Sequence, residues 1–194
     1  FANKQKRLAK ALDEEAKILK QKATELKKTR EKALHEFVKD EIKDYHKRNK
    51  KMPSKGKVKR YIEKFYRTEI NRKFQEQIRA FRKRVGAIED ELKQIEKILK
   101  NRFSKVVGIL DGPLIRGALK VVGRILDVFG IIFSVIDAVI TSISLANDIS
   151  RYGVQFGFNP WAILGLDEKG PGYDNPPLFV KGDSEGIDSD EPVH

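Results

Sequence analysis

Apolar residues recur along the first hundred positions at alternating steps of three and four, which is helical spacing. The first row is mostly alanine and leucine: Ala9, Leu12, Ala16, Leu19, Ala23, Leu26, Arg30, Ala33 and Phe37. The second row carries larger side chains: Phe74, Ile78, Phe81, Val85, Ile88, Leu92, Ile95 and Leu99. Small residues in one row leave space that large residues in the other can fill. The two rows therefore predict two helices that pack against each other.

A break in the helical pattern separates the two rows. Pro53 and Gly56 interrupt the sequence there, so the chain can reverse its direction. We therefore predict a long antiparallel helical hairpin, a coiled coil, in domain 1–103, with arms at residues 3–48 and 57–103. At 1.5 Å per residue, each arm would be about 65–70 Å long.

The predicted tip of this hairpin, residues 46–60, is strongly basic. No acidic residue lies between Asp44 and Glu63, and the cations of the tip are Lys47, Arg48, Lys50, Lys51, Lys55, Lys57, Lys59 and Arg60. One hypothesis is that they bind phosphates or anionic lipid headgroups; the alternative is a solvated loop in a lysine-rich protein. Nonspecific nucleic-acid binding fits the charge, whereas no groove-reading motif predicts sequence-specific recognition.

A narrow polar stripe marks the apolar segment 104–151. Its members follow helical steps: Arg116, Lys120, Asp127, Ser134, Asp137, Thr141, Ser144, Asp148 and Arg151. The residues between them are mostly Val, Ile, Leu, Phe, Ala and Gly. We expect one helix that begins near Leu114, after the helix-breaking Pro113. Because such a helix is apolar around most of its circumference, it must be covered by other helices or face lipid.

The most apolar part of this segment is long enough to cross a membrane. Val128 to Asn147 is a window of 20 residues whose only charge is Asp137, and about 20 residues span about 30 Å of hydrocarbon. A central Asp costs about 2.5–3.5 kcal/mol, so insertion is marginal and favours a segment that stays folded until it is released. The alternatives are the central helix of a soluble bundle, with Asp127 and Asp137 paired to basic residues of the hairpin, and an oligomer core.

The remaining residues form two short regions. Residues 152–166 predict an aromatic and glycine-containing loop followed by a short helix. Phe156, Phe158 and Trp161 are candidate anchors at a membrane interface, although capping of a helical core is the more usual role of such aromatic residues. Residues 167–194, rich in Gly, Pro and acidic residues, predict an irregular acidic tail.

Charge is distributed unevenly over a chain whose net charge is +12. Residues 1–103 carry 33 basic and 16 acidic residues, and residues 151–194 carry three basic and eight acidic residues. The basic part favours anionic partners. The chain has no cysteine and starts with Phe1 without a signal-peptide pattern. These features leave the localisation unknown. A membrane-active role would place the protein at a membrane, secreted or particle-associated, without a signal peptide.

No motif for catalysis is present. His35, His46 and His194 have no metal-ligand spacing to other candidate ligands. Glycines of the apolar segment do not form a phosphate-binding loop, and structural pairing explains Asp111, Asp127 and Asp137 better than acid–base chemistry does. We predict a non-enzymatic protein without a metal, a cofactor or a small-molecule substrate.

In its layout the chain resembles pore-forming bacteriocin-like toxins and phage tape-measure or virion membrane-penetration proteins. In these proteins a helical rod precedes an apolar part. The resemblance implies a membrane-inserting or pore-forming protein with anionic lipid and further copies of itself as partners. The chain departs from the colicin pore domain because it lacks a long charge-free apolar hairpin. The alternative is a structural particle component or coiled-coil assembly protein that binds nucleic acid nonspecifically through the basic tip.

Overall fold

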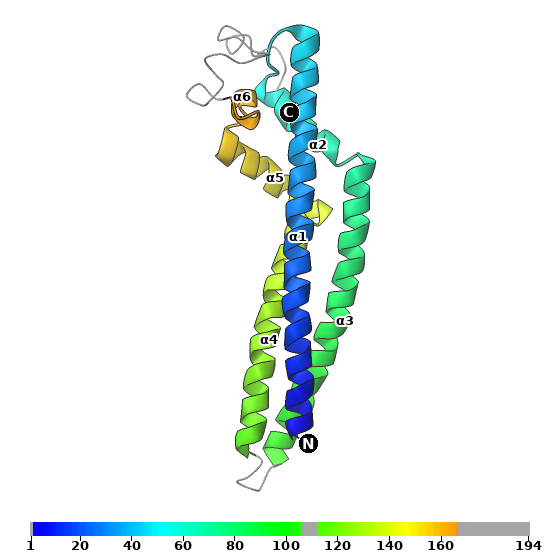
Figure 1. Ribbon diagram of the computed structural model, residues 1–194, viewed down its shortest axis with the longest axis vertical. Coiled ribbons are helices and arrows are strands. Elements are labelled where there is room, and N and C mark those ends of the chain that lie inside the picture. The colour runs from blue at the N-terminus through cyan, green and yellow to red at the C-terminus, as the bar shows by residue number, and fades with distance from the viewer. Residues whose placement is uncertain (1, 106–111, 167–194) are drawn as a thin grey trace. The chain divides into compact units, whose positions relative to one another are not determined.

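The computed structural model describes residues 2–105 and 112–166 (Figure 1). These residues form helices and contain no strand, so the all-α class is confirmed. The helices are α1 (Ala2–Asn49), α2 (Lys55–Phe65), α3 (Glu69–Lys105), α4 (Gly112–Val139), α5 (Thr141–Phe156) and α6 (Pro160–Ile163). The acidic tail predicted for residues 167–194 lies outside the described residues.

The first of two compact units comprises residues 1–28 and 76–140 and is called the three-helix unit. The first half of α1, most of α3 and all of α4 lie alongside one another in alternating directions (Figure 1). Arg84 of α3 forms an ion pair of 3.9 Å with Glu15 of α1. Arg82 of α3 forms another of 3.5 Å with Asp137 of α4. Each neighbour of α3 is therefore held by packing and by a charge pair.

Three rows of buried side chains form the core of this unit. The row on α1 consists of Ala9, Leu12, Ala16, Leu19 and Ala23, and the row on α3 includes Ile78, Val85, Leu92, Ile95 and Leu99. The third row is on α4 and consists of Ile115, Ala118, Val122, Ile125, Phe129, Ile132, Ile136 and Val139. The α4 row keeps steps of three and four, so one face of this apolar helix is covered within the chain.

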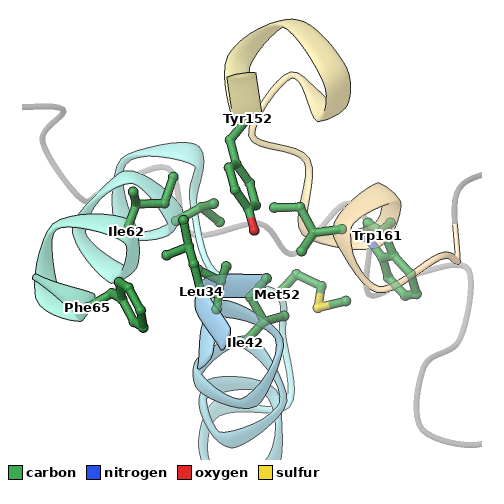
Figure 2. Close-up of a cluster of buried hydrophobic side chains, with 10 residues drawn as sticks. Leu34, Ile42, Met52, Ile62, Phe65, Tyr152 and Trp161 are labelled. Atoms are coloured by element: carbon green, nitrogen blue, oxygen red, sulfur yellow. The ribbon is translucent and has the colours of Figure 1, made fainter. Parts of the chain in front are cut away.

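The second unit comprises residues 29–75 and 141–194, and is called the tip unit because it contains the basic tip. Its core is formed by the second half of α1, by α2, and by α5 and α6 (Figure 2). The buried side chains are Leu34, Val38, Ile42, Met52, Val58, Ile62, Phe65, Tyr152, Trp161 and Ile163. Residues more than a hundred positions apart thus share one hydrophobic core.

The turn at the tip differs from the one predicted. α1 ends at Asn49, and Lys50 adopts a left-handed conformation with a φ of 60°. Ser54 caps α2, its side chain accepting a hydrogen bond of 3.1 Å from the Lys57 N–H. Gly56 does not break a helix, because it is buried within the first turn of α2. A glycine keeps its backbone N–H and lowers helix stability only through backbone entropy, so a single glycine in the first turn does not end the helix.

The second arm of the predicted hairpin is two helices instead of one. α2 ends at Phe65 and α3 begins at Glu69. Thr68 marks the break: its hydroxyl donates to the Phe65 carbonyl over 2.6 Å and accepts from the Asn71 N–H over 3.2 Å. A threonine followed by an acidic residue is a helix start signal that the seam analysis missed.

The single striped helix expected from Leu114 to Arg151 is also wrong. α4 ends at Val139 and α5 begins at Thr141, so the 20-residue window contains a helix break. The Ile140 N–H reaches the Asp137 carbonyl over 3.3 Å, an i to i−3 bond that ends the regular α-helical ladder. Apolar spacing continued across this point, and spacing alone does not reveal such a break.

Candidate functional site

The basic tip gathers its cations around the end of α1 and the start of α2. Lys47, Arg48, Lys50 and Lys55 are exposed, and Lys51, Lys57, Lys59 and Arg60 are half-buried. The Lys57 ammonium lies 5.1 Å from the centre of the Tyr45 ring, and that of Lys59 lies 5.4 Å from the Phe158 ring. No acidic residue occupies the first turn of α2. Positive charge therefore coincides with the positive end of the α2 dipole.

The polar stripe is divided between the two units. In the three-helix unit Arg116, Lys120, Asp127 and Ser134 are exposed, and half-buried Asp137 pairs with Arg82. In the tip unit Ser144 and Asp148 are buried and Arg151 is half-buried; the Thr141 side chain lies outside the described ones. The pairing of Asp137 with a basic residue of α3 is the one that the soluble-bundle alternative expects.

The three aromatic candidates all belong to the tip unit. Trp161 is 3% exposed and lies in the core cluster (Figure 2). Phe156 and Phe158 are half-buried and pack against that cluster. After Phe156 the chain turns through Gly157 and Phe158, which have positive φ values of 58° and 53°. Asn159 then caps α6 by accepting a hydrogen bond of 3.0 Å from the Trp161 N–H. In this fold the three side chains act as core or core-edge residues.

A buried ion pair joins α1 to α5. Arg30 is 1% exposed, and its Nη1 donates a hydrogen bond of 3.1 Å to Oδ2 of Asp148, whose side chain is 8% exposed. Arg30 Nε also donates to Asn71 Oδ1 over 3.2 Å, which connects the first turn of α3. A buried charge is tolerated when it is paired and hydrogen-bonded. Side chains from three helices therefore depend on one another.

Further side chains enclose this pair. Tyr66 donates its hydroxyl hydrogen to Asp148, and Arg151 Nη2 lies 3.4 Å from Oδ1 of the same carboxylate. The Arg30 guanidinium also lies 5.1 Å from the centre of the Tyr66 ring. Burial, reinforced by the hydrogen bond to Asp148, raises the pKa of Tyr66 to about 12. Tyr66 therefore remains a protonated donor across the physiological pH range.

The sequence does not reveal this network as a unit. Asp148 falls on the polar stripe of one predicted helix, and Arg30 falls in an otherwise apolar seam. An arginine at a seam position was the available signal, because a buried cation requires a buried partner. The identity of that partner depends on the fold, since the two residues are 118 positions apart.

His35 occupies a second polar position in the tip unit. Its Nδ1 lies 2.9 Å from the Tyr152 hydroxyl oxygen, and its ring stacks on Phe156 with a centroid distance of 5.7 Å. Burial lowers the pKa of His35 below its ordinary value of 6.5, and the charge of Lys39 acts in the same direction. The folded protein therefore favours the neutral imidazole.

This lowered pKa predicts acid sensitivity of the tip unit. The unfolded chain binds a proton at His35 more readily, so this contribution to stability is present above pH 6.5 and is lost progressively as the pH falls below it. Urea titrations across this range should show a smaller acid-dependent loss for His35→Gln than for the parent. Identical pH dependence of the two proteins would contradict the assignment.

The comparisons with known proteins do not suggest a site. No protein-family model matches the sequence, and no curated protein or solved structure is significantly similar to it. Within residues 2–105 and 112–166, no group of three or more His, Cys, Asp or Glu residues could hold a metal ion. No single helix in the same ranges is long and apolar enough to span a membrane, whereas Gly112–Val139 and Ile143–Phe156, taken together as a bent pair, reach the required length and composition.

Proposed function

We propose that this non-enzymatic protein is membrane-active: it keeps an apolar α4–α5 segment packed in its fold and delivers that segment to an anionic membrane. The observation that carries the proposal is the apolar surface of α4 beyond its buried row. Leu119, Leu126 and Phe133 flank the buried row on one side and are half-buried, as is Ile140 directly after α4. Val121, Val128 and Val135 flank it on the other side and are also half-buried.

The outer face of α4 loses its charges toward the end of the helix. Arg116, Lys120, Arg124 and Asp127 are exposed in the first part. Beyond them the exposed positions are Gly130, Ile131 and Ser134, and Ile131 is 47% exposed. A helix that is apolar on most sides but covered on one is suited to exchange its protein neighbours for lipid.

The charge of the chain supports an anionic membrane as the target. Residues 1–103 combine 33 basic residues with 16 acidic ones, and each basic residue near an anionic surface contributes about 1 kcal/mol of attraction. Electrostatic attraction would bring the protein to the surface first. Insertion of α4 and α5 would then follow from burial of their apolar side chains in lipid.

One observation favours self-assembly as a second candidate function. A Cβ atom built on Gly117, Gly123 or Gly130 would meet no atom within 4 Å, so the outer side of α4 is open at its glycines. Small residues allow a second helix to approach closely. In this alternative, α4 of another copy covers the surface around Ile131, and the protein is a structural assembly component.

Dye release from vesicles tests the proposal through Ile131. Ile131→Asp should reduce release from phosphatidylglycerol vesicles about 100-fold, because a charge near the centre of an inserted helix costs about 2.5–3.5 kcal/mol. Ile18→Asp is the matched control: Ile18 is 53% exposed on α1 and receives the same new charge outside the proposed inserting segment. Melting temperatures should change little in either variant.

The same assay can contradict the proposed membrane function. Equal release by the two variants would show that α4 does not insert. If the parent binds neither phosphatidylglycerol nor phosphatidylcholine vesicles at any pH from acidic to neutral, the membrane proposal is wrong. In that case sedimentation equilibrium should detect oligomers that Ile131→Asp dissociates and Ile18→Asp does not, as the assembly alternative requires.

A further inference from the structure

A groove on the three-helix unit combines cations with an apolar floor. Its volume is about 520 Å³, and its lining residues are Arg79, Arg82, Lys83 and Gly86 of α3, Phe133 of α4, and Ile140, which directly follows α4. The three basic residues are exposed, whereas Phe133 and Ile140 are half-buried. Small-ligand sites occupy about 300–1,000 Å³, so the groove has room for a polar headgroup and the first part of its acyl chains.

We propose that this groove binds the headgroup phosphate of an anionic phospholipid. The inference rests on the proposed membrane function and assigns its lipid contact to the three-helix unit instead of to the basic tip. Three cations and Gly86 line the groove. The space beside Gly86 is open, because a Cβ atom built on this residue would have no neighbouring atom within 4 Å. A phosphate can accept several charge-assisted hydrogen bonds at once.

The apolar lining distinguishes a lipid from a nucleic acid. Nucleic-acid strands are held by exposed aromatic rings on which bases stack. The groove has one aromatic ring, Phe133, and the guanidinium of Arg82 already lies 6.0 Å from its centre. Ile140 completes an apolar surface on which acyl chains can pack. A ligand with an anionic head and an apolar body matches this lining best.

Asp137 would be displaced when the phosphate binds. Its Oδ1 lies 3.5 Å from Arg82 Nη2, and both side chains are about half exposed, 44% and 51% respectively. A phosphate that takes over Arg82 breaks this ion pair and places two anions close together. The lipid would therefore loosen a contact between α3 and α4 at the end of the helix that we propose to insert. Conversely, the carboxylate lowers the affinity of the groove for phosphate.

Vesicle flotation tests the groove with matched charge changes. Arg79→Gln/Lys83→Gln removes two groove cations and leaves the pair of Arg82 with Asp137. Lys20→Gln/Lys28→Gln is the control, because these exposed lysines line a hollow of about 420 Å³ on α1 that contains no aromatic residue. Affinity for phosphatidylglycerol vesicles should fall about 30-fold for the groove variant and less than about 3-fold for the control. Lys50→Gln/Lys55→Gln measures the contribution of the basic tip in the same assay.

A variant with the opposite effect makes the test sharper. Asp137→Asn should raise the affinity for phosphatidylglycerol several-fold while leaving phosphatidylcholine binding unchanged, because Arg82 is freed and the repelling carboxylate is removed. Equal losses in the groove and control variants, or no gain for Asp137→Asn, would overturn the proposal. An equal loss of affinity for a single-stranded oligonucleotide in the groove variant would overturn the assignment to lipid.

Binding and dye release separate this inference from the proposed function. If the parent releases dye and the groove variant binds vesicles as tightly as the control does, the proposed phosphate site in the groove is wrong and the proposed membrane function stands. If only the groove variant loses binding but the parent releases no dye, lipid binding by the groove is supported and the proposed insertion of α4 is wrong. Absence of parent binding to every vesicle overturns both proposals.

Discussion

Asp148→Ala is expected to lower the free energy of unfolding of the tip unit by about 3–5 kcal/mol. The substitution leaves Arg30, which is 1% exposed, as a buried cation without its carboxylate. It also removes the acceptor of the Tyr66 hydroxyl and a neighbour of Arg151. Urea denaturation followed by circular dichroism, with hydrogen exchange at α5 amides, measures the loss and locates it.

Two controls separate the ion pair from a general effect of substitution. Arg30→Met/Asp148→Leu replaces both partners by apolar residues and should cost much less than Asp148→Ala, because no charge remains buried. Glu69→Ala breaks the exposed pair of Glu69 with Arg72 and should change stability little. If Asp148→Ala is no more destabilising than Glu69→Ala, the buried network does not hold the tip unit together.

Phe129→Ala is expected to destabilise the three-helix unit by about 3–5 kcal/mol, because it opens a cavity in a packed core. Phe129 is 0% exposed and belongs to the buried row of α4. If α4 must leave this core before it enters a membrane, the variant should also release vesicle dye faster than the parent. Thermal unfolding and dye-release kinetics, measured on the same preparation, test the two effects together.

Phe65→Ala is the matched control for this prediction. Phe65 is also 0% exposed, but it lies in the core of the tip unit. It should lose similar stability without accelerating dye release to the same extent, since it does not loosen the buried row of α4. Equal acceleration by both variants would show that general destabilisation, and not release of α4, controls the rate.

Periodic patterns predicted most of the rows of the three-helix unit. The alanine and leucine positions from Ala9 to Ala23 are buried, as are Ile78, Val85, Leu92, Ile95 and Leu99 of the second row, whereas Phe81 and Ile88 are half-buried. These rows could be read from sequence because burial of one helix face imposes a spacing of three and four. The pattern also located the apolar α4, although the structure was needed to show which of its faces is covered.

The sequence-based predictions failed mainly at helix breaks, where they placed one continuous helix instead of two. The interruption at Thr68 had a local signal, a threonine before an acidic first turn, but the apolar seam suggested one continuous arm. The break at Ile140 falls where apolar spacing continues unchanged. Heptad spacing reports which residues can share a face, and it does not report whether the backbone between them remains helical.

The sequence by itself determined the all-α class, the apolar rows, the charge of the basic tip and the apolar character of α4, because each depends on residue type and helical spacing. The tertiary structure decided which residues meet: Arg30 with Asp148, Arg82 with Asp137, and the α3 cations with Phe133. The physical reason is that pairing of charges and covering of apolar faces depend on distances in space. Chain spacing does not encode those distances when the partners lie on different helices.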